Sequence, residues 1–549
     1  MSTRIARGVA GAALLIGVVT VLARLVGFGR YLVQSQSVGN SCLGTAYNTA
    51  NYVPNIVFEL VAGGVLAGMV VPVLASAASR SDDDPEARAE VSRTTSALLT
   101  WAMLVLVPLT LLIVAFAGPI VALLVGDPAP CDLAGVVEAG TGMLVVFAPR
   151  MIFFGLAVVL YGVLQAHRRF MGPALAPLVS SLLIVGSNLL FEVVNEDAAK
   201  DLSALNGAGQ LSLSLGATVA AAAMVLTVVG PVSRLGLRLR PALTFPPGVA
   251  ATARRLATAG LAVLIAQQVT LIVVIRLANN LGGEGAIAAY TYAWALYQLP
   301  YAVLVMPIAT SSFPVLSTRA AEGDTPGFDA LTASTTRIVL LVTGLAAGVM
   351  AAVAVPVSQV FLKGTAGGDP AEMARGVALF APGLLGYALM LHLARVLYSC
   401  GRGRSAAVAS VTGWAVALVA QIVLAHTAGD RADVVGQLAL GSTVGMTVGG
   451  VLLTVAVLRA RGASALAGTP RTLLATLTGG ASAWGAGLAL VGVFGAVSTW
   501  ESVAVGLAAG VAGVAVFAAV AMTIDRQDAQ ALLARLRRGS AREGIRSDE

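Results

Sequence analysis

Long apolar segments, separated by short polar breaks, follow one another along almost the whole chain. Most run for about 20 residues or more, which is the length that an α-helix needs to cross a hydrocarbon core of roughly 30 Å. The pattern predicts an all-α polytopic membrane protein with about fourteen transmembrane helices. We expect these helices near residues 8–29, 46–77, 96–124, 136–166, 172–194, 210–233, 253–280, 285–315, 331–360, 374–399, 404–426, 434–458, 472–497 and 502–523.

The composition agrees with a membrane protein. Hydrophobic residues make up 57% of the chain, charged residues make up only 11%, and the mean hydropathy is +0.87. In a soluble domain charged residues make up about a quarter. The basic N-terminus and the apolar run behind it also fit a signal peptide. No small-residue cleavage site with a polar segment behind it ends that run, so we interpret it as a retained first helix.

Arginines gather in the loops on one side of the predicted membrane, and acids gather in the loops on the other. Loops rich in Arg and Lys resist translocation and stay in the cytoplasm. We therefore expect a multi-pass protein of the cytoplasmic (inner) membrane with both termini cytoplasmic. The net charge of +7 then reflects topology, and no nucleic-acid partner is expected. The N-terminal side carries Arg80, Arg88, Arg93, Arg168, Arg169, Arg234, Arg238, Arg240, Arg319, Arg402, Arg404, Arg459 and Arg461, and the other side carries Asp127, Asp132, Glu192, Glu196, Asp369, Glu372, Asp430 and Asp433.

Several landmarks occur twice, in the same order and at a nearly constant offset. Phe147-Ala148-Pro149 in the fourth predicted helix matches Phe380-Ala381-Pro382 in the tenth, and Pro54 in the second matches Pro300 in the eighth. Six helices separate the copies, an even number, so the two halves have the same orientation in the membrane. This predicts two six-helix lobes that face each other across a cleft.

The predicted organisation has four parts. An N-terminal lobe covers residues 1–240, a C-terminal lobe covers 241–462, and two further transmembrane helices cover 463–523. The basic tail, 524–549, either lies along an anionic membrane surface or is solvated and anchors the topology. Pro54 and Pro300 each remove a helical hydrogen bond, and each is either a hinge of an alternating-access cycle or a static kink.

Arg24 and Arg30 belong to the first helix, and Arg24 lies roughly 25 Å along it from Arg7. A charge inside a bilayer is costly and usually faces a bundle interior or a water-filled cavity. Two guanidinium groups at a cavity mouth suit phosphate or pyrophosphate, which arginine binds bidentately. The alternative for a lone Arg24 is that its side chain reaches the outer membrane interface.

Other polar residues lie within predicted helices. Glu59 either pairs with one of these arginines, takes part in ion coupling, or forms a structural ion pair. Asn55 follows Pro54, and Arg150 is a further cation inside the fourth helix. Gln298, just before Pro300, is a weaker candidate because amides often simply join helices.

Motifs for catalysis and nucleotide binding are absent: the chain has three His and neither a Walker A nor an H-E-x-x-H pattern. We therefore expect no enzyme and no cofactor, and transport driven by a membrane potential or by an ion or substrate gradient. Of three cysteines, Cys42 and Cys131 fall in loops predicted to lie outside, where a disulfide is possible, although three unrelated small residues explain them as well.

The motifs now identified resemble those of the MurJ (MviN) lipid II flippases. The resemblance is carried by 23–30, Ala-Arg-Leu-Val-Gly-Phe-Gly-Arg, by Val53-Pro54-Asn55, by Gly63-Gly64-Val65-Leu66 before Val71-Pro72-Val73-Leu74, and by the turn 164–170, Leu-Gln-Ala-His-Arg-Arg-Phe. It extends over essentially the whole chain.

This resemblance implies a MOP-type fold related to MATE exporters. It also implies flipping of undecaprenyl-pyrophosphate-linked disaccharide-pentapeptide from the inner to the outer leaflet, for peptidoglycan synthesis. In that family, arginines of the first helix line a cationic cavity for the pyrophosphate, and Arg24 and Arg30 match them. Expected partners are therefore the lipid-linked precursor, membrane lipids and cell-wall synthesis proteins, and we expect a monomer.

The chain departs from better-known members at two places. Those members carry arginines after the Pro-Asn of the second helix and before the Pro of the eighth, where this chain has Ile56-Val57-Phe58-Glu59 and Ala295-Leu296-Tyr297-Gln298. The departures leave open how the second lobe contacts substrate and whether Arg150 replaces a lost cation. Alternative functions are a flippase for another polyprenyl-pyrophosphate glycan, a MATE-like drug/cation antiporter, and a membrane scaffold without transport activity.

Overall fold

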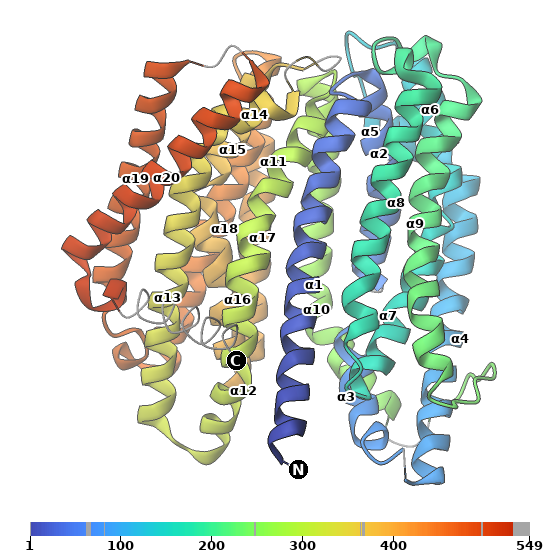
Figure 1. The fold of residues 1–549 in the computed structure, drawn as a ribbon, viewed down its shortest axis with the longest axis vertical. Helices are drawn as coiled ribbons and strands as arrows, with labels where there is room; N and C mark the ends of the chain where they lie inside the picture. The colour runs from blue at the N-terminus through green and yellow to red at the C-terminus, as the bar shows by residue number, and fades with distance from the viewer. Residues whose placement is uncertain are drawn as a thin grey trace. The chain divides into compact units, whose positions relative to one another are not determined.

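The computed structural model describes residues 2–61, 67–81, 83–245, 249–362, 364, 368–495 and 498–530. The chain divides into two compact units, and each is described by itself. Unit 1 comprises Met1–Ala288 and Gly364–Gly368, and unit 2 comprises Ala289–Lys363 and Asp369–Glu549. Helices account for all the regular structure in the described ranges, which confirms the all-α prediction (Figure 1).

Unit 1 is a bundle whose helix pairs α8 and α9, α1 and α8, and α7 and α9 pack along their lengths. Its connecting segments include the 3₁₀ helices η2 (Glu196–Ala199) and η3 (Leu202–Ala204) and the π-helix η4 (Ala278–Gly282). Its α-helices are α1 (Ser2–Ser37), α2 (Cys42–Phe58), α3 (Ala67–Ala78), α4 (Pro85–Ala115), α5 (Ala117–Val125), α6 (Leu133–Phe147), α7 (Arg150–Ala166), α8 (Met171–Asn195), α9 (Gly207–Ser233) and α10 (Val249–Leu277).

Unit 2 is a second bundle, in which α18 packs against α15, α16 and α17. Its short helices are the π-helix η5 (Tyr301–Val305) and the 3₁₀ helices η6 (Arg431–Asp433) and η7 (Ala463–Leu466). Its α-helices are α11 (Ala286–Pro300), which begins at the unit boundary, α12 (Met306–Glu322), α13 (Thr325–Ala352), α14 (Ala354–Leu362), α15 (Pro370–Phe380), α16 (Gly383–Ser399), α17 (Gly403–His426), α18 (Val434–Arg461), α19 (Thr469–Phe494) and α20 (Thr499–Ile524).

Twelve helices of the described chain are long and apolar enough to cross a membrane, and the bent pair α15 and α16 is a thirteenth candidate, with an angle of 44° between its parts. The remaining predicted crossing, 46–77, corresponds to α2 and α3, with 62–66 outside the described residues. Residues 59–61, at the end of α2, are π-helical. The first helix is longer than the predicted 8–29, because α1 continues to Ser37.

The repeat predicted from Phe-Ala-Pro is confirmed in the backbone, because both copies break a helix at this tripeptide. α6 ends at Phe147 and α7 begins at Arg150, and α15 ends at Phe380 and α16 begins at Gly383. Proline cannot donate to the preceding turn, so a carbonyl near the break needs another donor.

A threonine of a neighbouring helix supplies that donor in each unit. The Thr218 hydroxyl of α9 donates to the Val146 carbonyl at 2.7 Å, and the Thr443 hydroxyl of α18 donates to the Leu379 carbonyl at 2.6 Å. Each acceptor is the residue before the phenylalanine of its break, so the copies agree in side-chain bonding as well as in sequence.

The helices that follow the two breaks also end alike. The Arg169 amide donates to the Leu164 carbonyl at 2.8 Å, and the Arg402 amide donates to the Leu397 carbonyl, also at 2.8 Å. The residues before them, Arg168 and Gly401, have positive φ angles of 58° and 71°. A left-handed residue commonly closes a helix in this way, and glycine adopts it without cost.

The compact units do not follow the repeat boundary near residue 240. Although α10 begins the second copy in sequence, it packs against α3 and α5 and belongs to unit 1. Two of the predicted features lie outside the described residues, namely Gly63-Gly64-Val65-Leu66 and the tail from 531 onward.

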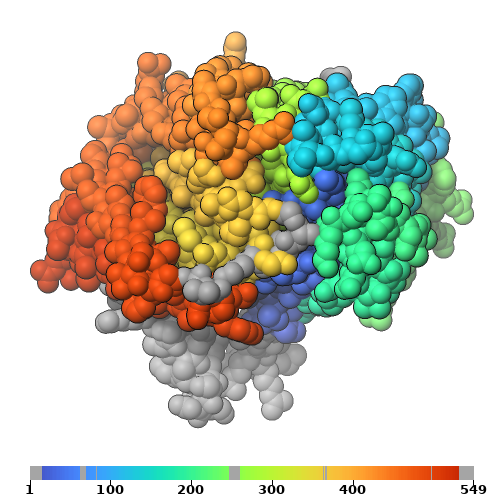
Figure 2. Space-filling model, turned by 90° about the horizontal axis from the view of Figure 1, so that it is seen from above, coloured from blue at the N-terminus to red at the C-terminus, as the bar shows by residue number. Residues whose placement is uncertain are grey.

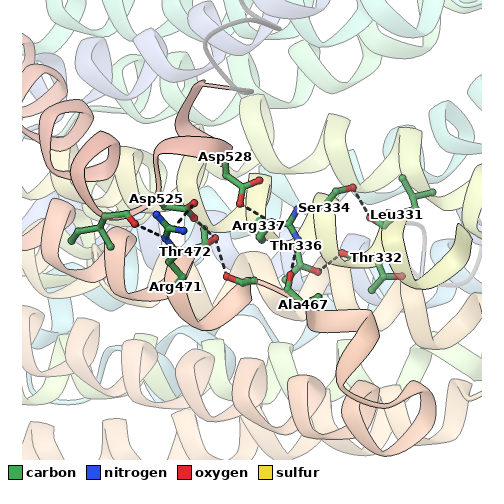
Figure 3. Close-up of polar contacts among 12 residues, drawn as sticks. Leu331, Thr332, Ser334, Thr336, Arg337, Ala467, Arg471, Thr472, Asp525 and Asp528 are labelled. Carbon is green, nitrogen blue, oxygen red and sulfur yellow. Dashed lines mark hydrogen bonds and ion pairs between the residues drawn. The ribbon is translucent and has the colours of Figure 1, made fainter. Parts of the chain in front are cut away.

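The last helices of unit 2 lie against α13. α19 packs on both α13 and α20, and the red helices adjoin the yellow ones in both views (Figures 1 and 2). Ionic contacts hold the chain after α20 in place (Figure 3). Arg337 Nε lies 2.7 Å from Asp528 Oδ2, and the Thr472 hydroxyl donates to the buried Asp525 carboxylate at 2.5 Å.

Candidate functional site

Arg150 is the most deeply buried arginine among the predicted site residues, with 4% of its surface exposed. It is the first residue of α7, placed there by the break after Pro149. Its Nη2 donates to the Asn51 carbonyl at 2.5 Å and to Asn55 Oδ1 at 3.4 Å. Both acceptors lie on α2, beside Pro54, so Arg150 ties the broken α7 to the proline-containing turn of α2.

Aromatic rings surround the Arg150 guanidinium. Its central carbon lies 4.7 Å from the ring centroid of Phe147 and 6.0 Å from that of Phe154. The Phe147 ring meets the Tyr47 ring edge-on, with centroids 5.7 Å apart. Such cation–π contacts stabilise an arginine by about 0.5–2 kcal/mol, but they leave its charge uncompensated.

Arg30 is half-buried on α1. Its Nη2 donates to the Tyr31 hydroxyl at 3.3 Å, and the guanidinium lies 5.0 Å from the centre of the same ring. The structure thus places two predicted cations, Arg30 on α1 and Arg150 on α7, inside unit 1, each against an aromatic ring.

Acids do not balance these two cations in the part of the chain that the structure describes. The ion pairs of Arg337, Arg375, Arg461 and Arg471 lie in unit 2, and neither Arg30 nor Arg150 takes part in them. Glu59 lies in the π-helical turn at the end of α2, where it is exposed and forms none of these pairs. Two arginines without a carboxylate form an electropositive site that favours an anion.

Arg24 does not join this group by direct contact in the described structure, and its side chain is exposed on α1. Arg30 lies six positions further along α1, and at 100° per residue the two side chains point in directions about 120° apart. The pairing of Arg24 with Arg30 at a cavity mouth therefore stays a prediction. Next to the site, Gln34 donates to Asn48 at 3.1 Å in a buried contact.

Sequence reasoning identified Asn55 and Arg150 but missed Asn51, Tyr47 and the Gln34–Asn48 contact. The missed residues are neutral and have no charge to mark them, although Asn51 precedes Pro54 by less than one turn. Their recruitment depends on how α1, α2 and α7 pack, which no local pattern encodes.

In unit 2 the residues just before Pro300 carry no cation. Gln298 is half-buried on α11, and Pro300 is the last residue of that helix. The π-helix η5 begins directly after Pro300, much as 59–61 follow Pro54 in unit 1. π-helical turns are rare and occur often at functional sites.

A protein-family profile described as "Lipid II flippase MurJ" matches residues 35–500. The chain belongs to the MurJ family. The matched residues include most of both units, both Phe-Ala-Pro breaks and the Arg150 contacts with α2. It also establishes the chain as an integral membrane protein of a transporter family.

Similar proteins from other bacteria carry the same MurJ name. The lipid II flippase MurJ of Burkholderia cenocepacia is 27% identical over 385 residues, covering 69% of this chain and 71% of that protein. A probable lipid II flippase MurJ of Synechocystis is 25% identical over 413 residues, covering 74% of each. A probable lipid II flippase MurJ of Rhizobium meliloti is 27% identical over 312 residues, or 54% of its length.

Solved structures support the same fold. A lipid II flippase MurJ in an inward closed conformation superposes with a TM-score of 0.72 at 16% identity, covering 93% of this chain and 99% of that one. An inward-facing MATE-family multidrug transporter of the MOP superfamily superposes with a TM-score of 0.63 at 13% identity. The match covers 81% of this chain and 96% of that one. At these identities the likeness shows the MOP-type fold alone, and that expectation from the motifs is confirmed.

Proposed function

We propose that this protein flips lipid II, the undecaprenyl-pyrophosphate-linked peptidoglycan precursor, from the inner to the outer leaflet of the cytoplasmic membrane, without changing it chemically. Membership of the MurJ family supports the substrate. In our proposal Arg30 and Arg150 bind the pyrophosphate, and Asn51 and Asn55 orient Arg150.

The observation that carries the proposal is a pair of arginines within candidate membrane-spanning helices, with no acidic partner among the described residues. A charge in a low-dielectric interior is costly until an opposite charge reaches it. A pyrophosphate would supply that charge, and guanidinium groups match its oxygens bidentately. A MATE-like cation substrate would be repelled from the same place.

Pro54 and Pro300 support an alternating-access cycle. Each is followed closely by a π-helical turn, so each helix has a local segment whose hydrogen bonding is already interrupted. Such turns accommodate a change of helix direction at low cost. We propose that these turns act as hinges, that Arg24 meets the substrate during the cycle, and that Glu59 takes part in coupling to an ion gradient or the membrane potential.

The experiment is complementation of cells depleted of this protein, with outer-face lipid II measured by an impermeant enzyme or probe. We expect wild type to restore outer-face lipid II, and Arg30→Ala and Arg150→Ala to leave it trapped inside at normal expression. Arg404→Ala is the control, because Arg404 is an exposed arginine at the start of α17.

Unchanged outer-face lipid II after depletion, with no second flippase in the cell, would exclude lipid II as the substrate. Another polyprenyl-pyrophosphate glycan would then become the leading candidate. Full activity of both arginine variants would instead reject the proposed pyrophosphate site, while lipid II would remain the proposed substrate.

A further inference from the structure

Unit 2 contains a dense cluster of aromatic side chains that the proposed pyrophosphate site does not use. The chain is poor in aromatic residues, at 5% overall, yet seven rings from α11, η5, α15, α16 and α17 touch one another here. We call this group the aromatic cluster, and it consists of Tyr290, Trp294, Tyr297, Tyr301, Phe380, Tyr387 and Trp414.

The cluster has a buried base and a more accessible layer. Tyr290, Tyr297, Phe380 and Trp414 are buried, whereas Trp294, Tyr301 and Tyr387 are only half-buried. A cluster that served packing alone would gain most by burying its largest rings completely. Here a tryptophan and two tyrosines keep part of their surface accessible.

Ring geometry holds the accessible layer rigid. Tyr301 and Tyr387 stack with centroids 4.3 Å apart and planes 25° apart. Tyr387 further stacks on Tyr297 at 5.7 Å, and Trp294 lies 5.1 Å from the Tyr297 ring. A ligand would therefore meet a surface that needs little ordering on binding.

The polar groups near this layer are mostly neutral. They include the tyrosine hydroxyls and the half-buried Gln298 amide, and the cation Arg395 of α16 donates to the Thr310 hydroxyl at 2.7 Å. The surface thus combines flat apolar ring faces with hydroxyl and amide groups at their edges. A sugar ring has the complementary form, because C–H bonds cover one face and hydroxyl and acetamido groups surround it.

We propose that the aromatic cluster is a carbohydrate-binding surface, on which Trp294, Tyr301 and Tyr387 stack against the sugar rings of the lipid-linked substrate. This rests on the proposed function, which supplies a substrate carrying amino sugars. It accounts for the departure at 295–298, where the chain carries Ala-Leu-Tyr-Gln in place of an arginine.

The test compares two ligands that share the lipid and pyrophosphate but differ in the sugars. The purified full-length protein, in nanodiscs, is titrated with lipid II and with undecaprenyl pyrophosphate. We expect wild type to prefer lipid II, and Trp294→Leu and Tyr387→Leu to bind lipid II about tenfold more weakly with unchanged affinity for undecaprenyl pyrophosphate. Tyr387→Phe, which keeps the ring, should retain most of the lipid II affinity.

The matched control is Trp500→Leu, because Trp500 belongs to the same unit but is 82% exposed on α20 and outside the cluster. It should leave both affinities unchanged. A second measurement avoids the risk that a cluster variant fails to fold: in wild type labelled with 5-fluorotryptophan, the resonance of Trp294 should shift with lipid II and stay in place with undecaprenyl pyrophosphate.

Equal weakening for the two ligands would overturn the proposal in favour of contact with the polyprenyl chain. If folded variants bind both ligands with unchanged affinity, and the Trp294 resonance does not shift with lipid II, the cluster serves only core packing. Wild-type binding of undecaprenyl pyrophosphate without any preference for lipid II would reject glycan recognition but keep the pyrophosphate site. Binding of neither ligand would reject the proposed function itself.

Discussion

Two buried ionisable residues show how differently single charges are accommodated in this fold. Arg150 has aromatic rings around it and two oxygens of α2 as acceptors. Glu372, at the start of α15, is 6% exposed, and its Oε1 has no hydrogen-bond partner. The sequence marks both as charges within predicted helices or at their ends, but only packing decides that Arg150 Nη2 is bonded and that Glu372 Oε1 is not.

For Arg150 we predict that lysine cannot replace arginine. A lysine keeps the positive charge but has a single ammonium group, which cannot bond to α2 and also grip a phosphate bidentately. Arg150→Lys should therefore lower flipping at least tenfold while the protein still folds. The measurement is outer-face lipid II in complemented cells, and wild-type activity of Arg150→Lys would show that charge alone is enough.

For Glu372 we predict that replacing the charged side chain does not harm the protein, and the measured quantity is thermal stability. A buried carboxylate that has an oxygen without a hydrogen-bond partner costs more than the neutral amide of the same shape. Glu372→Gln should therefore raise the melting temperature of the purified protein, or leave it unchanged. Glu192→Gln is the control, because Glu192 is exposed. A clear loss of stability in Glu372→Gln alone would reveal a favourable partner, such as a bound cation.

At the scale of elements, each Phe-Ala-Pro break occurs together with a threonine of a neighbouring helix that donates to a carbonyl at the break. The proline and the repeated Phe-Ala-Pro tripeptide predict the breaks from sequence. The donors, Thr218 and Thr443, lie on helices far away in sequence, so local pattern cannot assign them. The same holds for the segment after α20, whose acids Asp525 and Asp528 find partners on α19 and α13.

We predict that the two threonines contribute similarly to stability. Replacing either by valine keeps the shape but leaves a carbonyl at the break without this donor, which costs about 1–3 kcal/mol. Thr218→Val and Thr443→Val should each lower the melting temperature. Thr227→Val is the matched control, since the Thr227 hydroxyl bonds only within its own helix, to Ala223. An equal effect in the control would assign the loss to threonine-to-valine replacement in general.

At the scale of the whole molecule, a disulfide connects distant parts of unit 1. Cys42 at the start of α2 is bonded to Cys131 in the segment between α5 and α6, 89 residues away. The third cysteine, Cys400, is free and follows α16. Disulfides persist in oxidising compartments, so the bond agrees with the expectation that the loops bearing Cys42 and Cys131 lie outside.

We predict that reducing this disulfide lowers stability without abolishing the fold. A cross-link over a loop of this length stabilises by about 2–4 kcal/mol. The Cys42→Ser and Cys131→Ser variants, and wild type with a reductant, should melt at similarly lowered temperatures, whereas Cys400→Ser should match wild type. If the reductant lowers the melting temperature of wild type but not that of Cys42→Ser, the effect is assigned to this disulfide. Labelling of Cys400 only after the membrane is made permeable would support cytoplasmic loops at that end.

The sequence by itself determined the class of this protein, the approximate positions of its helices, the internal repeat and the family. Local hydrophobicity and short motifs predict these features. A segment that crosses a bilayer has to be a continuous apolar helix, whichever helices it packs against. Even Arg150 and Asn55 were identified in this way, because a charge or a proline stands out in an apolar run.

Only the tertiary structure decided which residues meet. It placed Arg150 against Asn51 and Asn55, grouped α10 with unit 1, gave Thr218 and Thr443 their acceptors, and assembled seven rings from five helical elements. Such contacts join residues far apart in sequence, and neutral side chains carry no periodic or charged signal of their own. Their positions follow from how whole helices pack, because each contact depends on the direction and depth of both partners.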